Sequence, residues 1–150
     1  DFMKSHPGGA LGQRLSCKVG EIMFKASAVP CVITGNTMTR AIEEMDQFRL
    51  GAVIVLNPAK QLMGIITDGD IRHCVAVGTP DFGQVAVENI MTPTPHCLGI
   101  DAFLYDALNL MEKYEITVLP IVGKENRLEG ILHLHDILGK GSFKFNGGSQ

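Results

Sequence analysis

Long apolar runs, basic clusters and secretion signals are all missing from this 150-residue chain. No uninterrupted apolar stretch is long enough to span a bilayer. The N-terminus lacks the charged-then-apolar pattern of a signal peptide. No run of five or more basic residues occurs, and the formal net charge is -3. We therefore expect a globular cytoplasmic protein that binds neither membranes nor nucleic acid.

Cysteine is also sparse and scattered, with no Cys-x-x-Cys pair anywhere in the chain. Cys17, Cys31, Cys74 and Cys97 lie too far apart in sequence to form a zinc-ligand motif. In a chain of this size they indicate reduced thiols, not a disulfide framework.

The most informative stretch that is present runs over residues 64–71 (GIITDGDI). An apolar run at 62–66 predicts a buried strand, and a helix-compatible run follows. Asp68 is expected to cap that helix, with Asp70 in its first turn. A carboxylate at Asp70 suits a ribose diol, while the hydroxyl of Thr67 and free amides suit a phosphate. The alternative is that Thr67 and Asp68 only cap the helix.

Residues 130–137 (GILHLHDI) repeat this stretch at an offset of 66. A unit of about 60 residues buries only a marginal core, so we expect the two units to share one, sheet against sheet. Two helical stripes at a 3.6-residue period repeat with the same offset and are expected to be buried. The first stripe is Met38, Ala41, Ile42, Met45 and Phe48, and the second is Leu104, Ala107, Leu108, Met111 and Tyr114.

The same order of elements is expected in both units. Thr37 and Asp101 are the expected N-caps of the two long helices. Pro120 removes one ladder donor and predicts an edge position or a bulge for its strand. The four expected long strands are 52–56, 62–67, 118–122 and 128–133. The first two are expected to pair antiparallel.

A β-α-β-β-α unit ending in Gly-x-x-[Ser/Thr]-x-x-Asp resembles the CBS domain. The resemblance implies an α+β fold of two CBS repeats packed sheet to sheet with pseudo-two-fold symmetry. The repeats would cover residues 19–78 and 87–141, joined by a linker at 79–86 and followed by a flexible tail at 142–150. Such pairs bind adenosine nucleotides or related ligands in clefts between the units.

The segment at 5–15 (SHPGGALGQRL) narrows the resemblance. It looks like the junction that follows the sugar isomerase (SIS) domain of arabinose 5-phosphate isomerases, which interconvert ribulose 5-phosphate and arabinose 5-phosphate on the route to Kdo of lipopolysaccharide or capsule. Residues 1–18 would be the linker from a missing SIS domain. A histidine of this segment is implicated in catalysis in that family and would correspond to His6, which cannot act here alone.

The resemblance also implies ligand contacts residue by residue. Thr67 matches the position that contacts phosphate, and Asp70 and Asp136 match the aspartate that holds ribose hydroxyls. His133 stands where Ser or Thr is expected, so the second site departs from the family pattern. Arg72 and His135 point to an anionic partner, since arginine grips a carboxylate or phosphate with two hydrogen bonds.

Two functions follow as hypotheses. In the first, the chain is the regulatory region of an arabinose 5-phosphate isomerase, with no catalysis of its own and no cofactor, and it senses an adenine nucleotide or CMP-Kdo. In the second, it is a ligand-free oligomerisation scaffold of the same enzyme. Either reading implies a homodimer or higher oligomer. A metal site at His133 and His135 is disfavoured, because zinc sites use at least three protein ligands.

Overall fold

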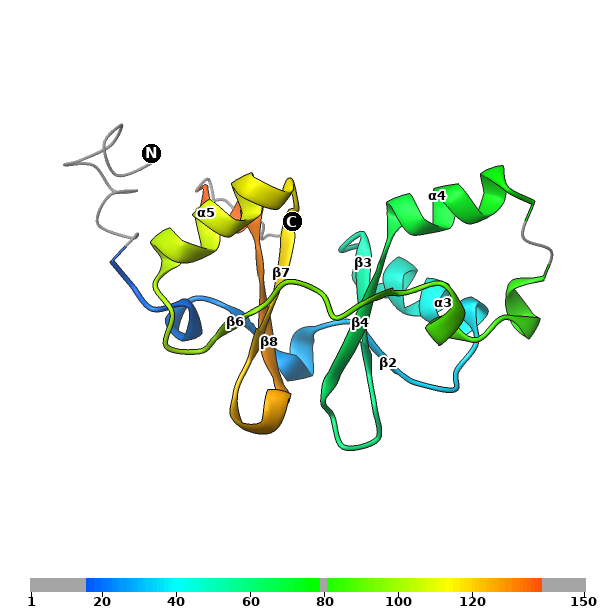
Figure 1. Ribbon diagram of the computed structural model, residues 1–150, viewed down its shortest axis with the longest axis horizontal. Helices are drawn as coiled ribbons and strands as arrows, with labels where there is room; N and C mark the ends of the chain where they lie inside the picture. Colours follow the sequence, from blue (N-terminus) through cyan, green and yellow to red (C-terminus); the bar gives the residue numbers. More distant parts are fainter. Residues whose placement is uncertain (1–15, 79–80, 139–150) are drawn as a thin grey trace. The chain divides into compact units, whose positions relative to one another are not determined.

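Residues 16–78 and 81–138 are described by the computed structural model (Figure 1). They form two compact units. One comprises residues 16–26, 97–123 and 129–138, and the other comprises residues 27–78, 81–96 and 124–128. Each unit contains one four-stranded sheet with α-helices beside it, which confirms the expected α+β class. No helix of the described residues is long and apolar enough to cross a membrane.

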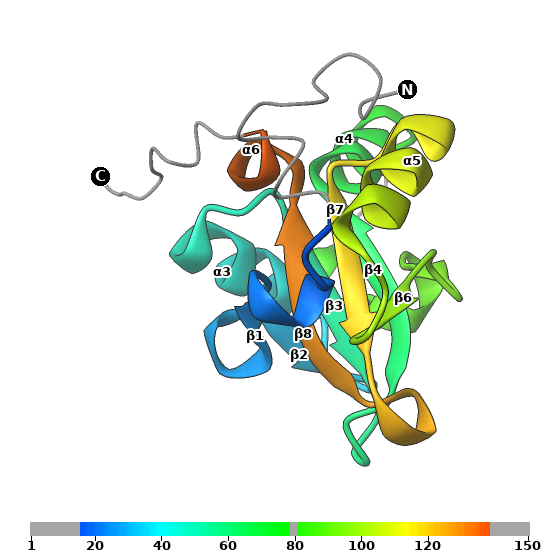
Figure 2. The same ribbon diagram turned by 90° about the vertical axis from the view of Figure 1, so that its left-hand side faces the viewer.

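The first sheet has the strand order β1-β8-β7-β6 (Figure 2). Helix α5 packs beside β7, and its apolar side chains join a buried cluster around Leu108, Met111 and Leu119. The elements are η1 (Val19–Glu21), β1 (Phe24–Lys25), β6 (Leu98–Gly99), α5 (Leu104–Tyr114), β7 (Val118–Val122), β8 (Leu128–His133) and α6 (Leu134–Ile137).

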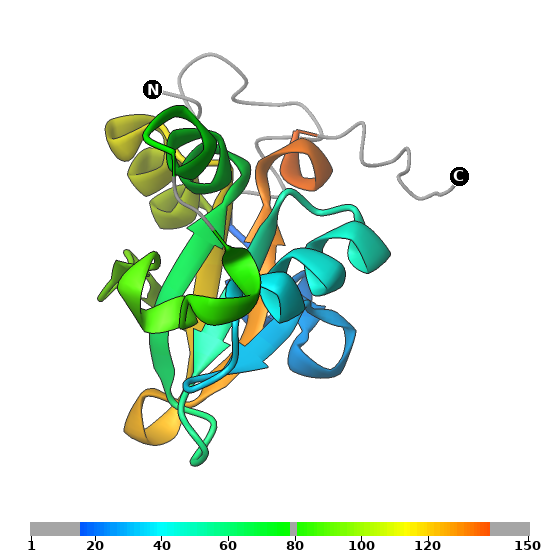
Figure 3. The ribbon, with the colours of Figure 1, turned by 90° about the vertical axis from the view of Figure 1, so that its right-hand side faces the viewer.

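The second sheet has the order β2-β3-β4-β5 (Figure 3). Helix α3 packs on β2 and β3, and α4 packs on β4. The antiparallel pairing of β3 with β4 confirms the expected hairpin. The elements are η2 (Ala26–Ala28), β2 (Cys31–Ile33), α3 (Met38–Phe48), β3 (Ala52–Leu56), β4 (Leu62–Thr67), α4 (Asp68–Ala76), η3 (Phe82–Gln84), η4 (Val87–Asn89), β5 (Thr92–Pro93) and η5 (Lys124–Asn126).

Each sheet is built mainly from one sequence repeat but includes a two-residue strand from the other repeat. Strand β1 precedes the first repeat's helix, yet it pairs antiparallel with β8, where Lys25 lies opposite Gly130. Strand β5 precedes the second repeat's helix and pairs antiparallel with β4, where Pro93 lies opposite Gly64. The structural units therefore interleave the two sequence repeats.

Three local expectations meet different outcomes. Thr37 is the N-cap of α3, as expected, and its hydroxyl accepts a hydrogen bond from the Arg40 amide at 3.3 Å. The prediction for Asp101 is wrong, because Phe103 is the N-cap of α5 and offers no side-chain cap. The edge position expected from Pro120 is also wrong, since β7 lies between β8 and β6. Strand β6 pairs only with Ile121 and Val122, so its ladder begins one residue after the proline.

The buried stripes are narrower than the helical periodicity predicts. Met38, Ala41 and Met45 of α3 are buried, but Ile42 is only half-buried and Phe48 is 38% exposed. In α5 the stripe is buried except for Tyr114, which is 41% exposed. The last turn of each helix therefore extends beyond the part of the sheet that it covers.

Candidate functional site

A reciprocal hydrogen-bonded turn joins β4 to α4. The Thr67 hydroxyl accepts from the Asp70 amide at 3.3 Å, and Oδ2 of Asp70 accepts from the Thr67 amide at 2.9 Å. The Thr67 hydroxyl also lies 3.2 Å from the same oxygen. This is a capping box, in which two otherwise unpaired amides at a helix start are satisfied by side chains. The N-cap is thus Thr67, and the prediction of Asp68 is wrong: Asp68 is the first helical residue.

The capping box uses only one carboxylate oxygen of Asp70. Within the described residues, the hydrogen bonds of Asp70 engage Oδ2 and the backbone amide, and none involves Oδ1. Both Thr67 and Asp70 are half-buried, so their side chains are accessible from one side. Arg72 follows on α4 with an exposed side chain. These three predicted residues therefore lie on one helix start.

The second predicted group lies in the other unit, at the start of α6. His133 is the N-cap there, and its Nδ1 accepts from the His135 amide at 3.2 Å. The two imidazole rings lie 5.1 Å apart with an interplanar angle of 31°. Asp136 is in the first turn of the helix. The neutral His133 ring therefore carries its proton on Nε2, which is the atom that can donate to an anion.

Burial lowers the pKa of His133 below its ordinary value of 6.5, and the neighbouring His135 lowers it further. The folded chain therefore binds fewer protons than the unfolded chain just below pH 6.5, and the contribution of His133 to stability decreases there as the pH falls. The structure therefore favours a neutral imidazole at His133.

We expect the free energy of unfolding to decrease more in the wild type than in His133→Asn when the pH is lowered from 7.5 to 5.5. Asparagine keeps a cap acceptor but does not titrate in this range. Urea unfolding at the two pH values measures the difference. Parallel losses in both proteins would show that His133 binds protons equally in the folded and unfolded states.

A metal centre gains no support from the described residues. No group of three or more His, Cys, Asp or Glu side chains lies close enough together to hold an ion in residues 16–78 and 81–138. The cysteines are free, and burial raises the pKa of the Cys31 thiol to about 11, which keeps it protonated at neutral pH. His6 lies outside the described residues.

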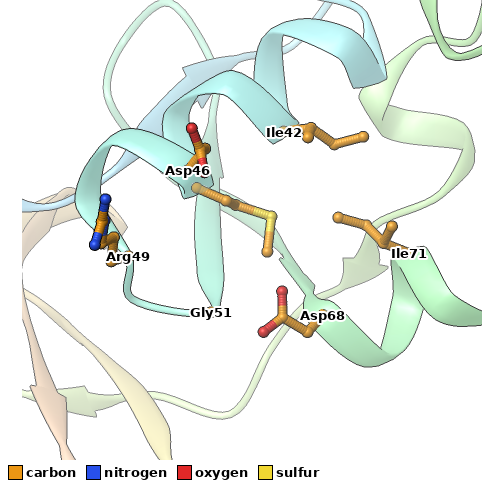
Figure 4. A pocket seen from close by; sticks show the side chains of 7 residues that line it. Ile42, Asp46, Arg49, Gly51, Asp68 and Ile71 are labelled. Carbon is orange, nitrogen blue, oxygen red and sulfur yellow. The ribbon is translucent and has the colours of Figure 1, made fainter.

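Sequence reasoning missed the pocket between α3 and α4 (Figure 4). Its volume is about 360 Å³. Charged residues at the end of α3 had been assigned no role, and Asp68 had been interpreted only as a cap. Gly51, just before β3, was the available signal in the sequence, because a glycine places no side chain at the pocket wall. The pocket is lined by Ile42, Met45, Asp46, Arg49, Gly51, Asp68 and Ile71.

The fold and the repeated capping turns define the class of protein. The family model described as CBS domain matches residues 19–77 and again 87–142. The chain therefore belongs to the CBS domain family and carries the domain as a pair.

Relatives and solved structures agree with this assignment. The chain is 38% identical over 141 residues to arabinose 5-phosphate isomerase KdsD of Pseudomonas aeruginosa, which covers 94% of this chain and 43% of the relative. The chain thus spans less than half the length of that relative. Hypoxic Response Protein I with two coordinated zinc ions matches with a TM-score of 0.72 and 25% identity, over 81% of this chain and 97% of that one. CBSX2 in complex with AMP matches with a TM-score of 0.71 and 22% identity, over 83% and 96%.

Proposed function

We propose that this chain is the ligand-sensing regulatory region of an arabinose 5-phosphate isomerase, and that its ligand is an adenine nucleotide or CMP-Kdo. The observation that carries the proposal is the similarity to KdsD, which extends over 94% of the chain. The AMP complex of CBSX2, a protein of the same fold, supports a nucleotide as the ligand. The catalytic domain of the isomerase would lie in the part of the relatives that this chain does not cover.

The ligand chemistry follows from the capping turn. Oδ1 of Asp70 accepts from a ribose hydroxyl while Oδ2 keeps its bond to the Thr67 amide. The Thr67 hydroxyl, held 3.2 Å from Asp70, turns to donate to a phosphate oxygen at the positive end of α4. Arg72 binds the carboxylate of CMP-Kdo or a further phosphate. At the other turn, His133 donates from Nε2 and Asp136 accepts from a hydroxyl, with His135 beside them on α6.

Regulation requires only that the ligand binds one state of the enzyme better than another. The shift between the two states equals the difference between the ligand's binding free energies for them. A cytoplasmic isomerase of this kind would then respond to the energy supply through an adenine nucleotide, or to the product of its own pathway through CMP-Kdo.

A thermal-shift titration of the 150-residue chain with AMP, ATP and CMP-Kdo tests the proposal. At a ligand concentration of one hundred times Kd, stabilisation of the folded state should be about 2.7 kcal/mol. Thr67→Ser keeps the hydroxyl and should keep the shift, whereas Thr67→Val removes it and should lose most of the shift. Asp70→Ala should also lose the shift, with each variant compared against its own ligand-free melting temperature.

The competing function is a ligand-free scaffold that holds the subunits of the same enzyme together. It predicts that none of the three ligands changes the melting temperature, and that Thr67→Val and Thr67→Ser differ only in helix capping. Analytical ultracentrifugation with and without ligand adds the oligomeric state, which we expect to be a dimer or larger. Absence of any ligand shift in the wild type would reject the sensor.

A further inference from the structure

The pocket between α3 and α4 has a charged side and an apolar side. In Figure 4, Arg49 lies at one side and Ile42 and Ile71 lie at the other, with Asp68 extending from the start of α4. Asp46 comes from the last turns of α3. Among the ion pairs of the described residues, none links Asp46 or Asp68 to Arg49. The ion pairs on α3 join Arg40 to two glutamates. Both signs of charge are therefore available to a guest.

The second repeat carries an apolar residue at the position of Asp68. Leu134 stands at the position of Asp68, and both amides donate to the backbone carbonyl at the same point of the preceding segment, at 2.8 Å to Thr117 and 3.1 Å to Gly51. Leu134 packs against the apolar cluster of its own unit. Ile137 is 1% exposed, whereas its counterpart Ile71 is half-buried.

The other pocket residues also differ between the repeats. Arg49 and Glu115 adopt the same left-handed conformation, with φ of 56° in both, at the ends of their helices. They carry opposite charges, so the guanidinium is specific to the first repeat. Gly51 is replaced by Thr117 at the pocket wall. The set of charged residues that lines this pocket is therefore specific to the first repeat.

We propose that this pocket binds a free α-amino acid with an aliphatic side chain, such as leucine. The α-carboxylate pairs with Arg49, the α-ammonium pairs with Asp68 and Asp46, and the side chain packs on Ile42, Met45 and Ile71. Charge-assisted hydrogen bonds of this kind are the stronger class of polar contact. A volume of about 360 Å³ is at the lower end of the range for small-molecule sites, in keeping with a ligand of this size.

This site is separate from the proposed nucleotide contacts. Neither Thr67 nor Asp70 lines the pocket, and Asp68 takes no part in the capping box. The chain can therefore bind a nucleotide without binding an amino acid, or the reverse. Measuring both ligands on the same variants distinguishes failure of one proposal from failure of the other.

The test uses calorimetric titration of the wild-type chain with L-leucine, 4-methylpentanoate and 3-methylbutylamine. The second compound lacks the ammonium group and the third lacks the carboxylate. We expect leucine to bind and each analogue to bind at least about tenfold more weakly, because each loses one charged hydrogen bond. Amide shifts of Gly51 and Asp68 in heteronuclear NMR spectra should follow the leucine titration.

Two variants copy the second repeat into the pocket. Asp68→Leu fills it and should abolish leucine binding. Arg49→Glu, at an exposed helix end, should also abolish leucine binding and make 3-methylbutylamine the better ligand. Glu43→Gln changes a charge on α3 outside the pocket and should leave leucine binding unchanged. Circular dichroism spectra show whether each variant is folded, and Arg49→Glu keeps the test available if Asp68→Leu unfolds.

Three results would overturn the proposal. The first is that leucine at millimolar concentration does not shift the Gly51 and Asp68 amides of the wild type. The second is that the amine analogue equals leucine in affinity, which would make the pocket a simple cation site. The third is that Asp68→Leu and Arg49→Glu are both folded and bind leucine as the wild type does, which would place the binding elsewhere.

Discussion

Gly130→Ala is expected to lower the free energy of unfolding by about 3 kcal/mol, at the upper end for overpacking substitutions. A methyl group at this position would collide with the backbone carbonyl oxygen of Phe24, and would lie 2.9 Å from Sδ of Met23. The carbonyl belongs to β1, which pairs with β8 directly at Gly130. Relief of the collision requires β1 to move away, which breaks that pairing. Urea denaturation measures the change.

Gly99→Ala is the matched control for this prediction. Gly99 is also a strand glycine, but the nearest atom to an added methyl group is the Val122 carbonyl oxygen at 4.0 Å. We expect its effect to be within about 0.5 kcal/mol, as for surface substitutions. Gly64→Ala should resemble Gly130→Ala, because its methyl group would meet Met91 and the Thr92 carbonyl oxygen at 2.9 Å. Equal losses for Gly130→Ala and Gly99→Ala would contradict the pairing of β1 with β8 at Gly130.

Leu108→Ala is expected to cost about 3 kcal/mol of folding free energy, within the range measured for truncating buried leucines. Leu108 is 1% exposed and lies within the cluster that also contains Leu104, Met111 and Leu119. Removal of its side chain leaves a cavity that these neighbours can fill only in part. The measurement is equilibrium unfolding by urea, monitored by circular dichroism.

Ile42→Ala tests the same helical position in the first repeat. Ile42 is half-buried and lines the pocket, so its truncation enlarges an existing space instead of creating an enclosed cavity. We expect a loss of about 1 kcal/mol, near the centre of the distribution for single substitutions. If Ile42→Ala were as costly as Leu108→Ala, the pocket would be closed by side chains in solution and the amino-acid proposal would lose its site.

Predictions from sequence were most accurate for the long strands. The expected ranges 52–56, 62–67, 118–122 and 128–133 coincide with β3, β4, β7 and β8. The first three ranges are largely apolar runs bounded by turn residues, and burial on both faces of a sheet produces that pattern. The fourth, LEGILH, is less apolar and is found as the repeat of the second. The turn at Thr67 and Asp70 was predicted from another local pattern, because hydroxyl and carboxylate residues are concentrated at helix starts. Its exact cap was shifted by one residue because Thr67 and Asp68 are both good N-caps.

Short strands and caps with little pattern were harder to predict. The two residues of β1 and the two of β5 are too few to show an alternation. The pairing of β1 with β8 and of β5 with β4 was therefore not predictable from local sequence. The N-cap position of α5 is occupied by Phe103, whose side chain offers no cap. Phe103 lies at the repeat position of Thr37, and this repeat geometry overrides the local preference of Asp101 for an N-cap.

The sequence by itself determined the duplication, the class of fold and the family, because these depend on periodic apolar patterns and on turn residues that act locally. The tertiary structure alone decided which short strand pairs at which glycine, how much of each apolar helical stripe is buried, and where an open pocket lies. Those features depend on contacts between residues far apart in the chain. Leu134 and Asp68 illustrate the difference: their amides make equivalent hydrogen bonds at the two helix starts, yet Leu134 packs against an apolar cluster and Asp68 lines an open pocket.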